Sequence, residues 1–218
     1  DWNNPQDNSF VFTEEFSVTR ANGIEARRPD IVCFVNGIPL VVIEAKRPDG
    51  NTKKGPTIDE GISQSLRNQR HDEIPRLFAY SQILLSINGH DGRYGTCGTP
   101  TKFWATWREE DISDLGMLAI KNRKLTAQQI DSIFSHRPVA CLEWYQNLTT
   151  AGDLAITGQD QLLISLLLPE RLLDMARFFT LFDKRAGKVI ARYQQVFSIK
   201  RLLQRIETKN PDGSRNGG

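Results

Sequence analysis

The sequence predicts an α/β fold in which a mixed β-sheet is flanked by helices and followed by a helical segment. Three observations predict it. Two apolar runs lie on either side of an Asn-Gly pair, and a helix signal near Thr57 stands between predicted strands. After Trp107 the composition shifts to one that favours helices. A strand-rich part with interspersed helices, followed by a helical part, indicates a sheet covered by helices.

The strands of the first part come from apolar runs. Residues 10–18 are rich in aromatic and β-branched side chains, which favour a strand. Residues 31–35 and 38–45 are apolar runs separated by Asn36-Gly37. Asn-Gly between two such runs is the strongest short-range signal for a β-hairpin.

Helix and strand signals alternate beyond this hairpin. A helix is predicted from Thr57 to about Arg70, because Thr57 and Glu60 fit a capping box. Residues 82–88 indicate a buried strand, and residues 102–107 indicate another.

The second part is predicted to be helical. Residues 109–136 carry a second cap signal at Thr126, and helical character returns from Gln159. Pro169 suits the first turn of a further helix, and a last helix is expected over residues 194–207. The apolar residues expected along the Pro169 helix are Leu172, Leu173, Ala176, Phe179 and Phe182. We place a domain boundary near residue 155, which divides the chain into residues 1–155 and 156–218.

The composition is that of an ordinary globular protein. The chain has 218 residues, of which 39% are hydrophobic and 25% charged, with a net charge of +2. These values argue against disorder. The longest apolar stretch, residues 162–168, is far shorter than the roughly 20 residues of a membrane helix, so we expect no membrane contact. Three scattered cysteines without a Cys-x-x-Cys pair favour a reduced, cytoplasmic protein.

Asp30, Glu44 and Lys46 carry the sharpest chemical signal. Hydrolysis of a phosphodiester with Mg²⁺ needs hard oxygen ligands and a group that orients water. The carboxylates of Asp30 and Glu44, with the carbonyl of Ala45, could bind the metal. Lys46 lies two residues after Glu44, so both side chains would project from the same face of a strand, and the lysine would stabilise developing negative charge.

This site sets a condition on the hairpin. In a strict two-residue hairpin Val35 pairs with Ile38, and Asp30 would then oppose Ile43 instead of Glu44. A three-residue loop or a β-bulge would bring Asp30 opposite Glu44, and we predict one of the two. The alternative interpretation is that these charges form a solvated face without catalysis. A buried strand that ends in Glu-Ala-Lys favours the functional interpretation.

Residues 28–48 also carry a resemblance. They begin Arg-Pro-Asp-Ile-Val and end Val-Val-Ile-Glu-Ala-Lys-Arg-Pro. This segment closely resembles the nuclease motif of the restriction (motor, R) subunit of type I restriction-modification enzymes. The resemblance implies an N-terminal PD-(D/E)xK endonuclease fold with Asp30, Glu44 and Lys46 as its site. Gln64 stands where the family has the Gln of a Gln-x-x-x-Tyr motif, and would be catalytic, but Asn68 replaces the Tyr.

Residues 188–197 resemble the approach to the helicase-type motor of this family. Gln194 is similar to the adenine-reading Gln upstream of such motors, although an ordinary helix start is the alternative. No phosphate-binding loop of the Gly-x-x-x-x-Gly-Lys-Ser/Thr type occurs in the sequence. We therefore expect ATP hydrolysis only in a full-length subunit, and interpret the chain as a fragment that stops before that loop.

Basic residues near the motif are candidates for phosphate contacts. Lys53, Lys54 and Arg67 could bind DNA, with simple solvation as the alternative. An upstream acidic ligand could come from Glu14, Glu15 or Glu25, and the sequence does not select one.

The leading hypothesis is a Mg²⁺-dependent endonuclease domain that cuts double-stranded DNA after ATP-driven translocation. The resemblance implies partners, namely the modification and specificity subunits of the restriction complex. Two alternatives stay open. The chain could be a non-catalytic DNA-binding or subunit-docking module with a nuclease-like fold, or the nuclease part of a repair helicase-nuclease.

Overall fold

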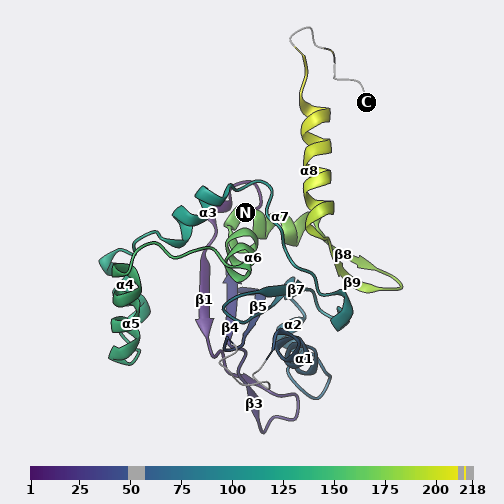
Figure 1. Ribbon diagram of the computed structural model, residues 1–218. Coiled ribbons are helices and arrows are strands. Elements are labelled where there is room, and N and C mark those ends of the chain that lie inside the picture. The colour runs from purple at the N-terminus through teal and green to yellow at the C-terminus, as the bar shows by residue number, and fades with distance from the viewer. Residues whose placement is uncertain (49–56, 211–213, 215–218) are drawn as a thin grey trace.

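A five-stranded mixed sheet forms the centre of the computed structural model, which describes residues 1–48, 57–210 and 214 (Figure 1). The strand order is β1-β4-β5-β6-β7. Only β5 and β6 pair in parallel, whereas the other neighbours pair antiparallel. The strands are β1 (Phe10–Glu14), β4 (Ile31–Val35), β5 (Ile38–Ala45), β6 (Ile83–Ile87) and β7 (Gly92–Gly95). The mixed α/β fold predicted from the sequence is confirmed at this level.

The hairpin between β4 and β5 contains the predicted irregularity. Asn36 and Gly37 both have positive φ, 50° and 80°, as a tight two-residue hairpin turn requires. Val35 pairs with Ile38, but the register shifts further along, so that Ile31 pairs with Ile43. The shift is a β-bulge, not a longer loop. It brings Asp30, which precedes β4, level with Glu44, and the prediction of a bulge or a longer loop is confirmed.

Helices cover both faces of the sheet, and the core divides accordingly. On β5, Val41 and Ile43 belong to the cluster under α6 (Gly158–Leu167) and α7 (Pro169–Phe178). Val42 points the other way, into the cluster under α1 (Ile58–Asn68) and α2 (Pro75–Phe78). The alternation follows from the two-residue period of a strand. Because both faces are covered, β5 reads as a continuous apolar run.

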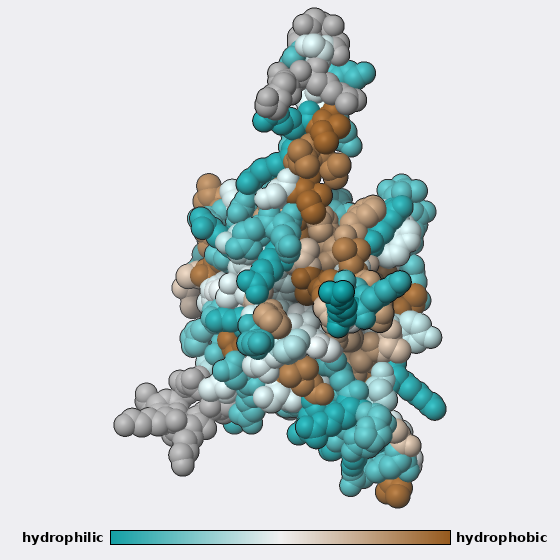
Figure 2. Space-filling model, turned by 90° about the vertical axis from the view of Figure 1, so that its right-hand side faces the viewer, coloured by the Kyte–Doolittle hydropathy of each residue, from teal (hydrophilic) through white to brown (hydrophobic). Residues whose placement is uncertain are grey.

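Smaller elements surround this centre. Strands β2 (Val18–Thr19) and β3 (Ala26–Arg27) form one hairpin, and β8 (Thr180–Asp183) and β9 (Gly187–Ile190) form another. The remaining elements are η1 (Pro5–Asp7), η2 (Thr101–Phe103), α3 (Asp114–Lys121), α4 (Ala127–Phe134), α5 (Val139–Thr150) and α8 (Tyr193–Glu207). Helix α8 projects from the body (Figure 1) and carries an exposed apolar stripe (Figure 2) of Ile199, Leu202, Leu203 and Ile206.

Several helix predictions are confirmed. Thr126 forms the predicted capping box with Gln129, Pro169 occupies the first turn of α7, and α8 matches the expected last helix. The predicted capping box at Thr57 is wrong. Thr57 is the N-cap of α1, but its side chain makes no capping hydrogen bond.

Three other predictions are corrected by tertiary contacts. The strand predicted over residues 10–18 ends at Glu14, because Glu15 adopts φ 47° and breaks the extended backbone. Residues 102–107 do not form a strand: the 3₁₀ turn η2 comes first, and Ala105 then makes a single bridge to Tyr94. Helix α7 ends at Phe178, so Phe182 belongs to the β8–β9 hairpin, not to the helix.

The core is continuous across residue 155. Leu162, Leu166 and Leu172, from the second part of the chain, share one buried cluster with Val41 and Ile43 of the sheet. The division into residues 1–155 and 156–218 stays a prediction. Among the described residues, none of the helices is long and apolar enough to cross a membrane.

This shared core leads to a first prediction. A chain ending at residue 155 leaves one face of the sheet without α6 and α7, so we expect it to aggregate or to lack a cooperative thermal transition. A chain ending at residue 207, which retains α6, α7 and α8, is the control. Calorimetry on both chains checks this, and a cooperative transition in the shorter chain would show that residues 1–155 fold alone.

Candidate active site

Three of the predicted polar residues lie together where β5 ends. Lys46 Nζ is 3.9 Å from Asp30 Oδ2 and 3.9 Å from Glu44 Oε2. Asp30 itself is held by the backbone, because its Oδ2 accepts a hydrogen bond of 2.7 Å from the Ala45 N–H. The structure therefore brings the carboxylates and the ammonium group together, as the bulged register of the hairpin requires.

Glu44 is the most unusual of these groups. Its side chain has no exposed surface, and its Oε2 has no hydrogen-bond partner among the residues that the structure describes. Burial raises the pKa of Glu44 to about 8, and the nearby charge of Asp30 raises it too, whereas Lys46 opposes the shift. A carboxyl group with this pKa is largely neutral at pH 7 in the metal-free protein. A cation beside Oε2 would reverse this preference.

Helix α1 presents two amide side chains to these charges. Gln64 Oε1 accepts a hydrogen bond of 2.7 Å from Lys46 Nζ. One turn later, Asn68 Nδ2 donates to Glu44 Oε1 over 3.4 Å, and Asn68 is only 1% exposed. Asn68 has no role predicted from the sequence. Its signal was the four-residue spacing from Gln64, which puts both side chains on one face of the helix.

A glycine allows α1 to approach the sheet closely. A Cβ on Gly61 would overlap Ser86 Oγ and would lie 3.5 Å from Glu44 Cβ. Ser86 Oγ also donates a hydrogen bond of 2.7 Å to the Ile58 carbonyl. The missing side chain at Gly61 therefore sets the distance at which Gln64 and Asn68 reach the strand.

The segment that leads into Asp30 is anchored by a second charge cluster. Arg27, the last residue of β3, makes two hydrogen bonds to the Glu73 carboxylate, of 2.6 and 2.8 Å. Arg20 Nε lies 3.1 Å from the same carboxylate. The hydrogen bonds from Arg27 lower the pKa of Glu73. This cluster holds the β2–β3 hairpin against the loop that follows α1.

The other predicted residues have different outcomes. Lys53 and Lys54 lie outside the described residues. Arg67 is exposed on α1, and its positive charge partly opposes the rise in the pKa of Glu44. Gln194 is exposed in the first turn of α8, which Figure 1 places on the far side of the molecule from α1.

The three candidate upstream acids have different contacts. The side chain of Glu14 pairs with Arg137, and that of Glu25 pairs with Arg20. Glu15 contacts the site through its backbone, because its N–H donates a hydrogen bond of 2.9 Å to the Asp30 carbonyl. Among the described residues, no group of three or more His, Cys, Asp or Glu could hold a metal. Asp30 and Glu44 thus form a site of two carboxylates. Mg²⁺ is commonly bound by one or two carboxylates together with water and substrate phosphates.

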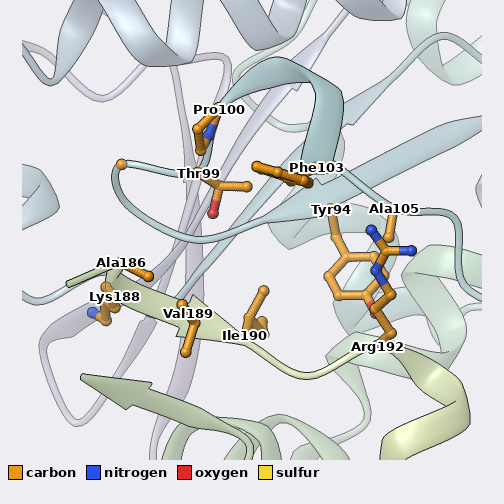
Figure 3. Close-up of a pocket in the computed structure, with 11 residues that line it drawn as sticks. Tyr94, Thr99, Pro100, Phe103, Ala105, Ala186, Lys188, Val189, Ile190 and Arg192 are labelled. Atoms are coloured by element: carbon orange, nitrogen blue, oxygen red, sulfur yellow. The ribbon is translucent and has the colours of Figure 1, made fainter. Parts of the chain in front are cut away.

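A well-formed cavity of about 380 Å³ lies elsewhere (Figure 3). It opens between β9 and the segment around η2, with Tyr94, Phe103, Lys188 and Arg192 among its lining residues. None of the predicted site residues that the structure describes lines it. The polar cluster at the end of β5 is separate from this cavity.

Comparison with known proteins decides the relationship. Residues 1–103 match the family described as the type I restriction enzyme R protein N terminus. The first 103 of the 218 residues are thus similar to the N terminus of these R proteins. The match contains Asp30, Glu44, Lys46 and Gln64, so the whole polar cluster falls within the R-protein region.

The similarity to individual relatives extends beyond residues 1–103. The HindI endonuclease subunit of a type I restriction enzyme from Haemophilus influenzae is 28% identical over 93% of this chain. The MjaIXP protein of Methanocaldococcus jannaschii has a name that assigns it provisionally to the endonuclease subunits of type I restriction enzymes. It is 28% identical over 94% of this chain. The EcoprrI endonuclease subunit of Escherichia coli is 38% identical over 33% of the chain. The chain spans 16% and 17% of the length of the first two relatives.

The raised pKa of Glu44 predicts the pH dependence of folding. The pKa is about 8 in the folded chain against 4.5 as its ordinary value, so this residue lowers the free energy of unfolding as the pH rises from 4.5 to 8. Without metal, Glu44→Gln is expected to be more stable than the wild type above pH 8, by on the order of 2–4 kcal/mol. Near pH 4 the two proteins should have nearly the same free energy of unfolding. Urea unfolding in the presence of EDTA measures this free energy.

The control for this measurement is Glu143→Gln on the exposed face of α5, which should leave the pH dependence as it is in the wild type. If the free energy of unfolding of Glu44→Gln follows the same pH curve as that of the wild type, Glu44 does not titrate near pH 8.

Gly61 gives a prediction about packing. Gly61→Ala places a methyl group against Ser86 and pushes α1 away from β5, so we expect a loss of about 1–3 kcal/mol in the free energy of unfolding. Ser63→Ala, on the exposed side of the same helix, is the control. Equal thermal stability of the two variants would contradict the close approach of α1.

Proposed function

We propose that this chain is the Mg²⁺-dependent endonuclease domain of a type I restriction enzyme R subunit, with a PD-(D/E)xK site made by Asp30, Glu44 and Lys46. One observation carries the proposal. The fully buried carboxyl group of Glu44 lies beside a second carboxylate and an ammonium group, and one of its oxygens has no hydrogen-bond partner in the described part of the chain. Burial of such a group is costly unless it is neutral or paired with a cation.

The donor set suits Mg²⁺. Asp30 and Glu44 would hold the ion through carboxylate oxygens, and the Ala45 carbonyl would add a hard oxygen ligand of the kind that Mg²⁺ prefers. When bound, the ion supplies positive charge at the phosphate and lowers the pKa of a coordinated water.

The side chains of this chain would then do the following. Lys46 Nζ, held by Gln64 and facing both carboxylates, donates hydrogen bonds to the attacking water and stabilises the negative charge that develops on the phosphate. Gln64 keeps the ammonium group in place. Arg67, exposed on α1, would contact DNA phosphates, and Lys53 and Lys54 join this role on sequence grounds alone.

The wider system follows from the family. The full-length R subunit would use ATP to translocate double-stranded DNA in the cytoplasm, with Gln194 near its nucleotide, and would act with modification and specificity subunits. The names of the relatives favour restriction over a repair helicase-nuclease.

The test uses the full-length subunit that contains this chain, assembled with its partners. Lys46→Ala is expected to reduce DNA cleavage at least 100-fold while DNA-stimulated ATP hydrolysis persists, because the lysine acts at the phosphate and not in the motor. Lys102→Ala, an exposed lysine near Phe103, is the control.

Gel assays of supercoiled DNA measure the cleavage, and phosphate release measures the ATPase. Cleavage by Lys46→Ala at the wild-type rate would show that the site is assigned wrongly. The non-catalytic interpretation, in which the domain binds DNA or docks a subunit, would then take its place.

A further inference from the structure

Asn68 is the last residue of α1, and its side chain is enclosed by the site. Its Nδ2 donates to Glu44 Oε1 over 3.4 Å, and its Oδ1 accepts from Arg67 Nη2 over 3.5 Å. The guanidinium group can only donate. The amide oxygen must therefore face Arg67, which leaves the amide nitrogen to face Glu44.

This contact makes the two oxygens of Glu44 unequal. Oε1 has a donor in Asn68, whereas Oε2 has no hydrogen-bond partner in residues 1–48, 57–210 and 214, and lies 3.9 Å from Lys46 Nζ. We propose that Asn68 is a positioning residue that holds Oε1, so that Oε2 is the oxygen presented to a divalent cation. The inference rests on the proposed function, because it concerns the cation that Glu44 would bind.

The two amide side chains of α1 then hold different residues of the site. Gln64 holds Lys46 over 2.7 Å, and Asn68 holds Glu44 from one turn further along the same helix face. The close approach at Gly61 places both amides. In this arrangement the Asn68 amide occupies Oε1, and a cation would bind at Oε2, on the side of Lys46.

The first experiment follows the Asn68 amide directly. In ¹⁵N-labelled chain, the side-chain NH₂ resonances of Asn68 are assigned by their absence in Asn68→Leu. Addition of Mg²⁺ is expected to shift these resonances, because the cation changes the charge on the carboxylate that Nδ2 contacts. Calorimetric titration should show about tenfold weaker Mg²⁺ binding in Asn68→Leu, since a hydrogen bond to a charged group is lost.

Ser65→Ala is the matched control. Ser65 is equally buried on α1, but its Oγ has no hydrogen-bond partner among the described residues, so its removal should leave Mg²⁺ affinity unchanged. If the wild type binds Mg²⁺ while the Asn68 resonances stay in place and Asn68→Leu binds equally well, the inference is wrong although the proposed function stands.

A metal-free double-mutant cycle separates the two proposals further. Asn68→Leu should lower the melting temperature of the wild type more than that of Glu44→Leu, because the contact is already lost in the second background. Additive shifts would overturn the contact on which the inference depends. Absence of Mg²⁺ binding to the wild type would overturn the proposed function, and the role of Asn68 toward a cation with it.

Discussion

The burial of the Glu44 carboxyl group is the constraint on which the rest of the site depends. Strand β5 is covered by helices on both faces, and its penultimate residue is this carboxyl group. A buried carboxylate without a full set of partners is strongly disfavoured. The folded chain accommodates it with a raised pKa, one amide donor and a lysine, and leaves one oxygen free. That free oxygen is the reason to expect a cation.

Two backbone features give this carboxyl group its neighbours. The bulge in the β4–β5 hairpin moves Asp30 level with Glu44, where the Ala45 N–H holds it. The bare backbone at Gly61 lets α1 approach until its amides reach the same strand. Neither feature contributes a functional group. Both bring residues that are distant in sequence into one cluster. The arrangement of the site therefore depends on how the hairpin and α1 pack.

The helical part of the chain belongs to the same packing. Arg171 on α7 pairs with the buried carboxylate of Glu109 and stacks over the rings of Trp107 and Phe197. It therefore joins the segment after the sheet to the start of α8. An unpaired guanidinium at this depth would be costly, so α7, α8 and the sheet keep a defined arrangement. Residues that follow position 155 thus complete the core against one face of the sheet that carries the site.

The sequence by itself determined the local pieces of this protein. The Asn-Gly turn, the apolar runs of β4 and β5, the cap at Thr126 and the need for an irregular hairpin all follow from short-range pattern and stereochemistry. Only the tertiary structure decided which charges meet. The end of the first strand at Glu14, the β8–β9 hairpin and the contact of Asn68 with Glu44 depend on packing between distant segments. Such contacts leave no periodic signal, because the partners are chosen by the distance between elements and not by neighbours in the chain.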